Sequence, residues 1–517
     1  MIAKAAARLE RALPGPLTGV RLFAAAILIG LGNFLVVLDT TIANVSVPTI
    51  AGNLGVSSTQ GTWVITSYAV AEAITVPLTG WLAKRFGAQR VFITCYLAFA
   101  AISLLCGLAS SLGMLLGARV LLGLFGGPIM PLSQMLLLRI FPKEKATLAT
   151  VIWAMTTLIG PVAGPILGGI LCDNYGWEWI FFIKVPIAAA GGLALLMLMR
   201  GQADPTSEAF IDKVGLALLI VWVGALQIML DEGRNKDWFA SPEIRTLGIV
   251  AAIGFVCFLI WELTEKNPIV DLKIFRHRGF VGAATTYAVG FGGFFASIVI
   301  LPLWLQSNMG YTATWAGYAT GIMGIFAVLS APFVGKACEK YDPRLIVCGG
   351  VLGLAGIMLW RMWEFNPDVT FLQMAWPMLL TGPFMVMFFV PVTGLAMSSV
   401  DHDEQANAAG LSNFMRTLAG AFATSLIQSG WSDATRRNEG EIVNAMQHGR
   451  AAIDGMVAQG IPLDNARAVL WQVIEGQSVM LATLNMFGVI AVCLGASAMI
   501  IWLVPKPKGP IDTSGAH

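Results

Sequence analysis

Five charged side chains lie inside long apolar stretches of the sequence, and their types are suited to proton chemistry. They are Asp39, Glu72, Arg119, Lys184 and Arg416. A charge at the centre of a membrane helix costs roughly 2.5–3.5 kcal/mol even on insertion scales, so such residues face one another or a water-filled cavity. A carboxylate in this setting can take up a proton, and a neighbouring cation changes its affinity for that proton. These charges therefore indicate proton movement within a membrane.

Three of the charges are predicted to lie at similar depths. Counting inward from the outer helix ends at about 1.5 Å per residue places Asp39 ~12 Å, Arg119 ~10 Å and Glu72 ~15 Å deep. We therefore expect one shared pocket, in which Asp39 or Glu72 takes up the proton and Arg119 modulates its affinity. The alternative is a permanent Asp39–Arg119 ion pair that only fixes helix packing. For Glu72, a contact with a cationic drug and a hydrogen-bonded structural role remain open.

We expect structural roles for the other two charges. Lys184 lies about 8 Å deep by the same rise, so its ammonium can reach the interface, and we expect a snorkelling lysine. Arg416 lies near the middle of its predicted helix. We expect it to donate an interhelical hydrogen bond and to be the contact contributed by the second half of the molecule.

Long apolar runs must position these charges. Of the 517 residues, 56% are hydrophobic and only 12% are charged, and the mean hydropathy is +0.74, which is typical of a polytopic membrane protein. About 20 apolar residues cross ~30 Å of hydrocarbon. This criterion predicts fourteen helices, at residues 22–46, 62–82, 91–109, 112–138, 146–171, 178–199, 213–230, 245–262, 280–304, 315–336, 344–362, 371–398, 407–428 and 477–504.

Lysine and arginine indicate the orientation. With the N-terminus in the cytoplasm, about two thirds of these residues fall in cytoplasmic segments, as the positive-inside rule requires. We therefore expect an inner-membrane protein with both termini in the cytoplasm. The net charge of +2 comes without a concentrated basic patch, so no nucleic-acid partner is expected.

A weak internal repeat suggests the domain organisation. The turn PLTGWLAKRFGAQR at 77–90 resembles the turn APFVGKACEKYDPR at 331–344. If the two turns are equivalent, the chain forms two six-helix halves, a design used by transporters with a midplane site. The predicted parts are a cytoplasmic arm at 1–21, a first half at 22–199, an inserted helix pair with flanking loops at 200–279, a second half at 280–504 with an outer loop at 429–476, and a cytoplasmic tail at 505–517.

The run GPVAGPILGG, residues 160–169, lies in the fifth predicted helix. Small residues let membrane helices approach closely, and neighbouring helices satisfy the backbone groups that proline leaves free. We therefore expect a bent helix that packs against another helix through this run. The motif residues are Gly160, Pro161, Gly164, Pro165, Gly168 and Gly169.

Taken together, the motifs resemble the major facilitator superfamily, and GPVAGPILGG is similar to the antiporter signature of its exporters. The segments LDTTIANVSVP (38–48), GWLAKRFG (80–87), GARVLLG (117–123) and WEWIFFIKVP (177–186) resemble its fourteen-span drug:proton antiporter family. The segments TQGTWVITSY (59–68), WELTEKNPIVDLKIF (261–275) and GYTATWAG (310–317) resemble the EmrB type within that family. This resemblance implies an all-α polytopic membrane protein with the major facilitator fold, in which two six-helix halves and two inserted helices make fourteen transmembrane helices.

The resemblance also implies a function. The chain is expected to be a multidrug efflux antiporter that exports hydrophobic toxic compounds across the bacterial inner membrane, with the proton gradient as energy source and no cofactor. A periplasmic adaptor protein and an outer-membrane channel are the implied partners, and the segment 429–476 is the candidate contact. The resemblance also assigns Gly80, Arg85 and Gly87 to the cytoplasmic turn motif between the second and third helices.

Two other functions are alternatives to this one. A single-component major facilitator exporter of a narrower substrate is the alternative among transporters. An intramembrane enzyme or sensor is the alternative of another class. The sequence contains no G-x-x-x-x-G-K-[ST], G-x-S-x-G or H-E-x-x-H motif, so we expect neither ATP drive nor a catalytic or metal site.

The chain departs from the family pattern at four positions. Lys84 occupies the place of the usual Asp in the cytoplasmic turn, and Leu122 that of a Gln in the fourth span. Lys184 stands where the entry to the sixth span usually carries Asn, and Glu72 is not part of the pattern. Two of these departures, Lys184 and Glu72, add charges to the membrane part of the first half.

Overall fold

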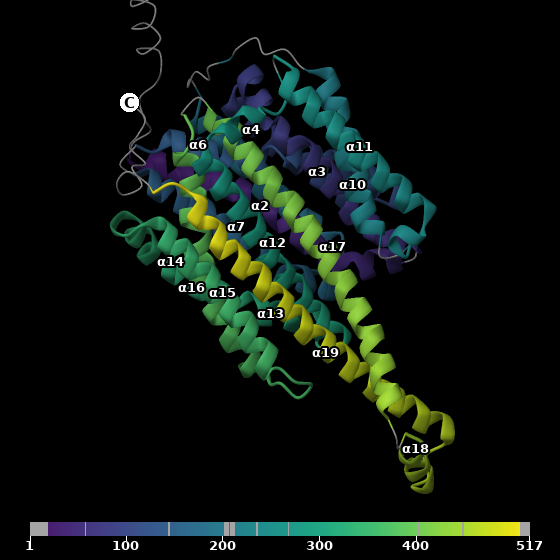
Figure 1. Ribbon diagram of the computed structural model, residues 1–517. Helices are drawn as coiled ribbons and strands as arrows, with labels where there is room; N and C mark the ends of the chain where they lie inside the picture. Colours follow the sequence, from purple (N-terminus) through teal and green to yellow (C-terminus); the bar gives the residue numbers. More distant parts are fainter. Residues whose placement is uncertain are drawn as a thin grey trace, which may run out of the picture.

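The computed structural model is a helical bundle, and helices are the only regular secondary structure in the part of the chain that it describes (Figure 1). The structure describes residues 19–56, 58–142, 145–200, 206, 212–233, 236–266, 268–401, 404–446 and 449–506. Most of the predicted N-terminal arm, C-terminal tail and loop after residue 200 therefore lie outside the described residues.

The first half runs from α2 to α9. Its helices are α2 (Gly19–Asn53), α3 (Ser58–Phe86), α4 (Ala88–Gly107), α5 (Leu112–Gly126), α6 (Ile129–Ile140), α7 (Ala146–Asn174), α8 (Trp179–Phe182) and α9 (Lys184–Leu198). The inserted pair consists of α10 (Lys213–Glu232) and α11 (Pro242–Thr264). The second half contains α12 (Arg278–Ser307), α13 (Ala313–Gly321), α14 (Met323–Lys340), α15 (Pro343–Glu364), α16 (Phe371–Ser398), α17 (Gln405–Ala445), α18 (Gly449–Ala458) and α19 (Leu463–Ile500).

Each of the fourteen predicted segments corresponds to one helix or to two consecutive ones. The fourth predicted segment, for example, is divided into α5 and α6 near Pro128, which has no backbone N–H to continue the ladder. Twelve helical segments among the described residues are long and apolar enough to cross a membrane. The helices α3 and α17 carry more polar side chains and fall short of that criterion, so their crossing stays a prediction.

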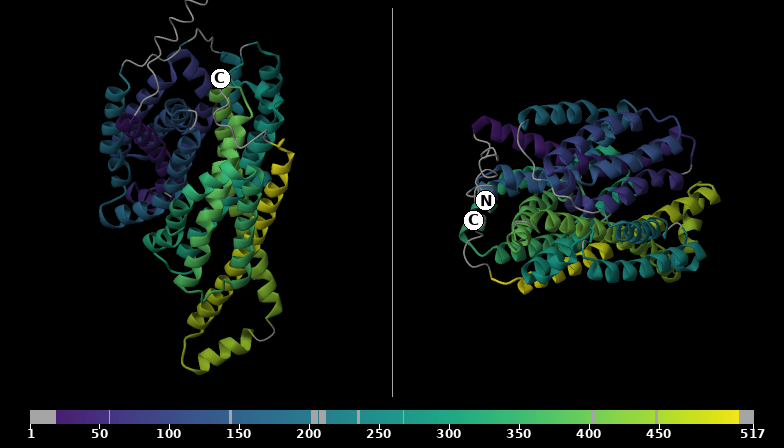
Figure 2. Two further views of the ribbon diagram at one scale, coloured as in Figure 1. Left: turned by 90° about the vertical axis from the view of Figure 1, so that its left-hand side faces the viewer. Right: turned by 90° about the horizontal axis from the view of Figure 1, so that it is seen from above.

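The same helix pairs pack together in both halves, which explains the internal repeat. In the first half α2 packs on α7, α4 on α9 and α3 on α5; in the second half α12 packs on α17, α15 on α19 and α14 on α16. Viewed from above, the two halves lie side by side (Figure 2). Contacts between them run from α3 and α6 to α17, and from α7 to α13, α14 and α16.

The inserted pair lies against one of the two seams between the halves. The helix α10 packs on α3 of the first half, on α17 of the second half and on its own partner α11. The Ser425 hydroxyl of α17 donates a hydrogen bond to the Leu230 carbonyl of α10 at 2.6 Å, and the Trp238 indole donates to the Ser429 hydroxyl at 3.1 Å. The inserted pair therefore covers the seam between α3 and α17.

The predicted outer loop at 429–476 is mostly helical, so its description as a loop was wrong. The helix α17 continues to Ala445, α18 follows at Gly449–Ala458, and α19 begins at Leu463. The Trp431 indole donates to the Thr483 hydroxyl at 2.9 Å, and the Asn438 amide donates to the Ser478 carbonyl at 3.1 Å. These bonds hold α17 and α19 together as a projection with α18 at its tip (Figure 1).

Candidate functional site

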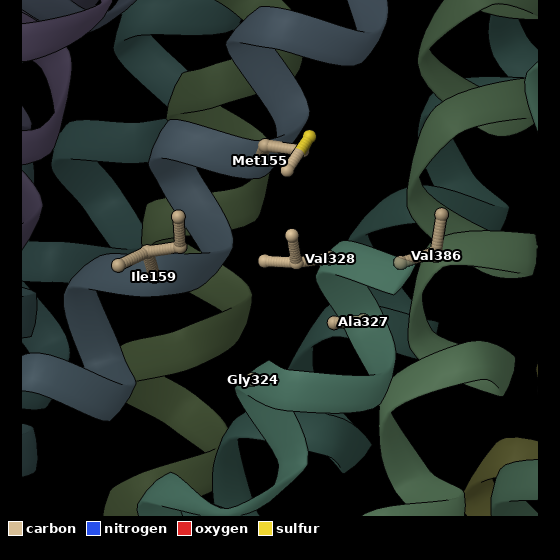
Figure 3. A pocket seen from close by; sticks show the side chains of 6 residues that line it. All are labelled: Met155, Ile159, Gly324, Ala327, Val328 and Val386. Carbon is tan, nitrogen blue, oxygen red and sulfur yellow. The ribbon is translucent and has the colours of Figure 1, made fainter. Parts of the chain in front are cut away.

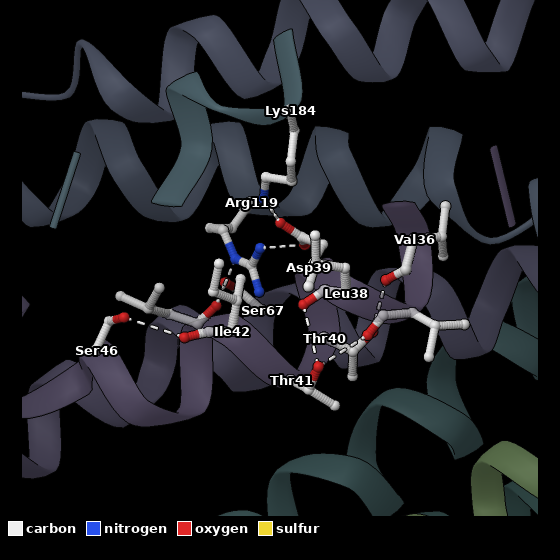
Figure 4. A network of polar contacts seen from close by, with 12 residues as sticks. Val36, Leu38, Asp39, Thr40, Thr41, Ile42, Ser46, Ser67, Arg119 and Lys184 are labelled. Carbon is white, nitrogen blue, oxygen red and sulfur yellow. Dashed lines mark hydrogen bonds and ion pairs between the residues drawn. The ribbon is translucent and has the colours of Figure 1, made fainter. Parts of the chain in front are cut away.

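Asp39 of α2 is the centre of a buried charge cluster in the first half (Figure 4). Arg119 of α5 donates from Nη1 to the Asp39 Oδ2 at 2.6 Å, and Lys184 of α9 donates from Nζ to the Asp39 Oδ1. All three residues are 0% exposed. The predicted proximity of Asp39 and Arg119 is confirmed, and each carboxylate oxygen has its own cation.

Aromatic rings and one backbone carbonyl complete the surroundings of the two cations. Arg119 Nε donates to the Val64 carbonyl of α3 at 2.8 Å, and the guanidinium lies 4.5 Å from the centre of the Tyr68 ring. The Lys184 ammonium lies 4.7 Å from the centre of the Phe181 ring and 5.9 Å from that of Phe99. Ring faces attract cations, most strongly where water is excluded. The cluster is thus enclosed by protein on several sides.

Lys184 does not snorkel, and that prediction was wrong. Its side chain turns into the bundle and binds Asp39 rather than reaching the interface. The physical reason is that a partner carboxylate lies within reach on α2, and a paired charge is far less costly in an apolar interior than a lone one. The sequence contained a signal for this, because Lys184 stands where the family pattern usually carries Asn.

Gly123 allows α3 and α5 to bring their charged residues close together. A Cβ atom at this position would lie 2.5 Å from the Tyr68 carbonyl oxygen and 3.1 Å from the Glu72 backbone nitrogen. The Thr75 hydroxyl bridges the same helices, because it donates to the Gly123 carbonyl at 3.3 Å. Of the two glycines in GARVLLG, only Gly123 makes this close approach, since nothing lies within 4 Å of a Cβ built on Gly117.

Glu72 is a further buried acid, on the helix α3 that also packs against α17 of the second half. It is 7% exposed and lies one helical turn beyond Tyr68 on α3. It interacts electrostatically with Arg416 of α17, and also with Asp39 and Arg119. Asp39 forms its ion pairs with Arg119 and Lys184. A single pocket shared by Asp39, Glu72 and Arg119 stays a prediction.

Arg416 contacts the first half directly. Its Nη2 donates to the Met130 sulfur of α6 at 2.8 Å, and its guanidinium lies 4.7 Å from the centre of the Phe291 ring. One turn earlier on α17, the Asn413 amide donates to the Gln134 amide oxygen of α6 at 3.4 Å. The prediction that Arg416 donates an interhelical hydrogen bond is confirmed.

The antiporter motif packs α7 against α2 in the same half. A Cβ atom on Gly160 would lie 2.6 Å from Val37 Cγ1, and one on Gly164 would lie 3.0 Å from the Ile42 backbone nitrogen. A Cβ on Gly168 would lie 3.0 Å from the Ile42 carbonyl oxygen, and the Thr41 hydroxyl donates to the Gly160 carbonyl at 3.1 Å. The spacing of four residues places these glycines on one face of α7. The predicted close packing of the motif is confirmed.

The same helix also touches the second half. A Cβ atom on Gly317 of α13 would lie 2.9 Å from the Ile166 backbone nitrogen and 3.1 Å from the Pro165 carbonyl carbon. Pro161, Pro165 and Gly169 are all buried. The motif helix is therefore held between α2 of its own half and α13 of the other half.

The cytoplasmic turn motif also serves contact between the halves. A Cβ atom on Gly80 would collide with the Asn407 side chain at the start of α17. Gly87 has a φ of +91°, a left-handed conformation that glycine adopts without strain, and it links α3 to α4. Arg85 is exposed in the last turn of α3, where a cation complements the helix dipole.

Sequence reasoning missed further buried charges, and Arg361 of α15 is the most enclosed of them. This residue is 1% exposed and donates from Nη2 to the Thr381 hydroxyl of α16 at 3.2 Å and to the Met378 sulfur at 2.6 Å. Its guanidinium lies 5.9 Å from the centre of the Phe487 ring of α19. Because Arg361 lies at the end of its predicted span, the sequence places it at the interface.

A small apolar pocket lies at the seam that the inserted pair does not cover (Figure 3). It is lined by Met155 and Ile159 of α7, by Gly324, Ala327 and Val328 of α14, and by Val386 of α16. Both halves contribute to it, and none of its lining side chains is charged. The seam is therefore apolar at this point.

The fold and the buried charges define a polytopic membrane transporter. The family model of the Major Facilitator Superfamily matches residues 29–424. The structure is similar to that of the proton:xylose symporter XylE, with a TM-score of 0.57, 14% identity and coverage of 95% of this chain and 98% of that chain. At this identity the likeness shows the fold alone.

Curated relatives narrow the assignment. The chain is 42% identical over 503 residues to the multidrug export protein EmrB of Escherichia coli, covering 96% of this chain and 97% of the relative. It is 40% identical to the fatty acid resistance protein FarB of Neisseria gonorrhoeae, covering 95% of this chain and 98% of the relative. The chain belongs to the major facilitator superfamily, and within it to the EmrB-type multidrug transporters. It is thus a membrane exporter of small molecules.

Proposed function

We propose that this chain is a proton-driven antiporter that exports hydrophobic toxic compounds across the bacterial inner membrane. The observation that carries the proposal is the enclosed cluster of Asp39, Arg119 and Lys184. Ionised groups inside a membrane protein are costly and typically mark proton or substrate pathways. A cluster of acid and base can change its protonation state between two conformations. The proton gradient is the proposed energy source, without a cofactor.

The apolar pocket supports the choice of substrate class. Its lining by Met155, Ile159 and Val328 offers dispersion contacts and no fixed charge. Methionine is flexible and adapts to differently shaped partners, which suits a broad substrate range. The pocket lies between the halves, so movement of one half against the other would change its shape.

We further propose that the pump works with a periplasmic adaptor protein and an outer-membrane channel. The projection formed by α17, α18 and α19 is the candidate contact. A helix of 41 residues is about 60 Å long, twice the ~30 Å of hydrocarbon that it must cross. The projection then lies in the periplasm if both termini are cytoplasmic, as the distribution of lysine and arginine favours.

Drug susceptibility and transport test this function together. Expression in a pump-deficient strain should raise resistance to hydrophobic compounds, and the gain should require a matching adaptor. Purified protein in liposomes should exchange protons for substrate when a pH gradient is imposed. Resistance that is complete without any adaptor would favour the single-component exporter, and substrate movement that ignores the pH gradient would contradict antiport.

A further inference from the structure

The Asp39 cluster contains one acid and two bases, and this imbalance is informative. Arg119 and Lys184 each bind a separate oxygen of Asp39, and none of the three is exposed. The other groups that face Lys184 are the Cys106 thiol of α4 and the rings of Phe99 and Phe181. With its ordinary charges, the cluster therefore holds three charges and a net charge of one positive unit. Glu72 makes none of these ion pairs, although it acts electrostatically on Asp39 and Arg119, and Arg416 of α17 acts on it in turn.

The possible proton changes differ in the charges they leave behind. A proton added to Asp39 would leave two buried cations and no anion. An arginine guanidinium does not lose its proton in proteins. A proton lost from Cys106 or from the Tyr68 phenol would create a fourth buried charge. Only the loss of a proton from Lys184 leaves two charges of opposite sign in direct contact, which is the least costly arrangement in an apolar interior.

We propose that Lys184 carries the exchangeable proton of this cluster, while Asp39 stays ionised as the partner of Arg119. On release an Nζ–H bond breaks, its electron pair stays on the nitrogen, and the proton passes to water; uptake reverses these steps. The inference rests on the proposed antiport and names the group that performs it. Lysine suits this role, because its ammonium loses a proton readily when buried and arginine does not.

Two substitutions at this position should fix the cluster in opposite states. Lys184→Asn leaves the neutral Asp39–Arg119 pair, which corresponds to the state after proton release. Lys184→Arg keeps a permanent positive charge, which corresponds to the loaded state. In an antiporter the substrate binds better to the form that has released its proton, and linkage makes this coupling reciprocal. The two variants should therefore differ in affinity in opposite directions.

The experiment uses the full chain in detergent and Nile red as a neutral lipophilic probe, so that direct charge repulsion of the probe plays no part. We would measure its dissociation constant between about pH 5 and pH 9, and proton release on binding with a pH-sensitive dye. In the wild type, affinity should rise with pH by about tenfold per unit over the range in which Lys184 titrates. Lys184→Asn should bind tightly and Lys184→Arg weakly, both without this pH dependence and without proton release.

Matched controls separate this role from a structural one. Lys213→Arg and Lys213→Asn change an exposed lysine at the start of α10 and should behave as the wild type. Melting temperatures would report folding, and Lys184→Gln provides a second neutral variant if Lys184→Asn does not fold. Wild-type behaviour of Lys184→Arg would overturn the proposal, since only the charge would then matter.

Two further outcomes are decisive. Full pH dependence in both Lys184 variants, together with its loss in Glu72→Gln, would assign the proton to Glu72 and overturn the inference while leaving antiport intact. A wild type that binds the probe but releases no proton at any pH would contradict the proposed antiport itself. The failure of the inference and the failure of the function are thus distinguishable.

Discussion

At the scale of single residues, the charged side chains of the first half have different roles because they have different partners. Asp39 binds two cations inside the half, whereas the charges that act on Glu72 include Arg416 of the second half as well as Asp39 and Arg119. A residue that stabilises one half need not respond to the movement of the other half. Glu72 and Arg416 are placed to do so.

Removing the acid at the centre of the cluster should abolish transport. Asp39→Asn keeps the size of the side chain and its hydrogen-bonding capacity, but leaves Arg119 and Lys184 without an anion. We expect loss of drug-dependent proton exchange in liposomes, with membrane insertion unchanged. The measurement is proton release on addition of substrate at matched protein amounts. Coupling at the wild-type level in this variant would remove Asp39 from the mechanism.

Glu72 should set the preference for cationic substrates. An acid in an apolar setting offsets the desolvation of a bound lipophilic cation only by pairing with it, and neutral compounds gain nothing from its charge. Glu72→Gln should weaken binding of cationic dyes by about 1–3 kcal/mol, roughly a tenfold to hundredfold loss of affinity. Resistance to cationic and to neutral or weakly acidic compounds should be compared at equal expression.

The pattern of loss identifies the role of Glu72. Loss confined to cationic compounds supports the prediction. A uniform loss for both classes would instead make Glu72 a coupling carboxylate beside the Asp39 cluster. Unchanged resistance to every compound would leave it a structural acid.

At the scale of helices, α7 carries the contacts that alternating access must preserve or break. Its glycines lie against α2, and its backbone near Pro165 and Ile166 lies against Gly317 of α13. The helix α7 therefore packs against both halves. Glycine is required here for close approach, because backbone atoms of Val37 and Ile42 are among the nearest neighbours and cannot move aside easily.

A bulky side chain on the α2 face of α7 should block transport. In Gly164→Leu the new side chain would collide with Thr41 and approach the Ile42 backbone nitrogen. Overpacking of this kind costs about 1–3 kcal/mol, and we expect export to be lost while pH-dependent proton binding to the charge cluster persists. Gly117→Leu is the matched control, since its Cβ meets nothing within 4 Å. Normal export by Gly164→Leu at equal expression would refute the requirement for close packing.

At the scale of the whole molecule, the two seams between the halves are unequal. The inserted helix α10 covers the seam of α3 and α17, whereas the apolar pocket lies at the seam of α7 and α14. The long helices α17 and α19 add a second asymmetry, since they extend the second half beyond the bundle (Figure 1). Movement of that half would therefore also move the projection.

The tip of the projection should be needed in cells but not for substrate binding. Val443 and Leu463 are each 46% exposed there, although they are apolar. The double variant Val443→Glu and Leu463→Glu should reduce adaptor-dependent resistance, because a buried interface does not accept unpaired charge. Probe binding in detergent should stay unchanged. Gln459→Glu adds a charge at an exposed polar position and serves as control; equal resistance in all three proteins would exclude this contact.

The sequence by itself determined the helical class and the presence of internal charges. Backbone groups in lipid must be satisfied within each segment, so runs of about 20 apolar residues have few alternatives to helix. The predicted segments accordingly correspond to helices throughout the described chain. The free-energy cost of a charge in the membrane likewise indicated that Asp39 and Arg119 would lie close together. The small residues of GPVAGPILGG predicted a close helix contact, though not its partner.

Only the tertiary structure decided the direction in which Lys184 and Arg361 point and the conformation of the segment 429–476. Lys184 can reach the interface or turn inward from the same place in the sequence, and the choice depends on a carboxylate that α2 supplies from 145 residues away. Arg361 can likewise point to the interface or into the bundle, and in the structure it points inward and donates hydrogen bonds to Thr381 and Met378. The segment 429–476 is too polar for hydropathy to reveal its helices, which are stabilised by contacts between α17 and α19. In each case the deciding interaction lies between residues distant in sequence, so no local pattern records it.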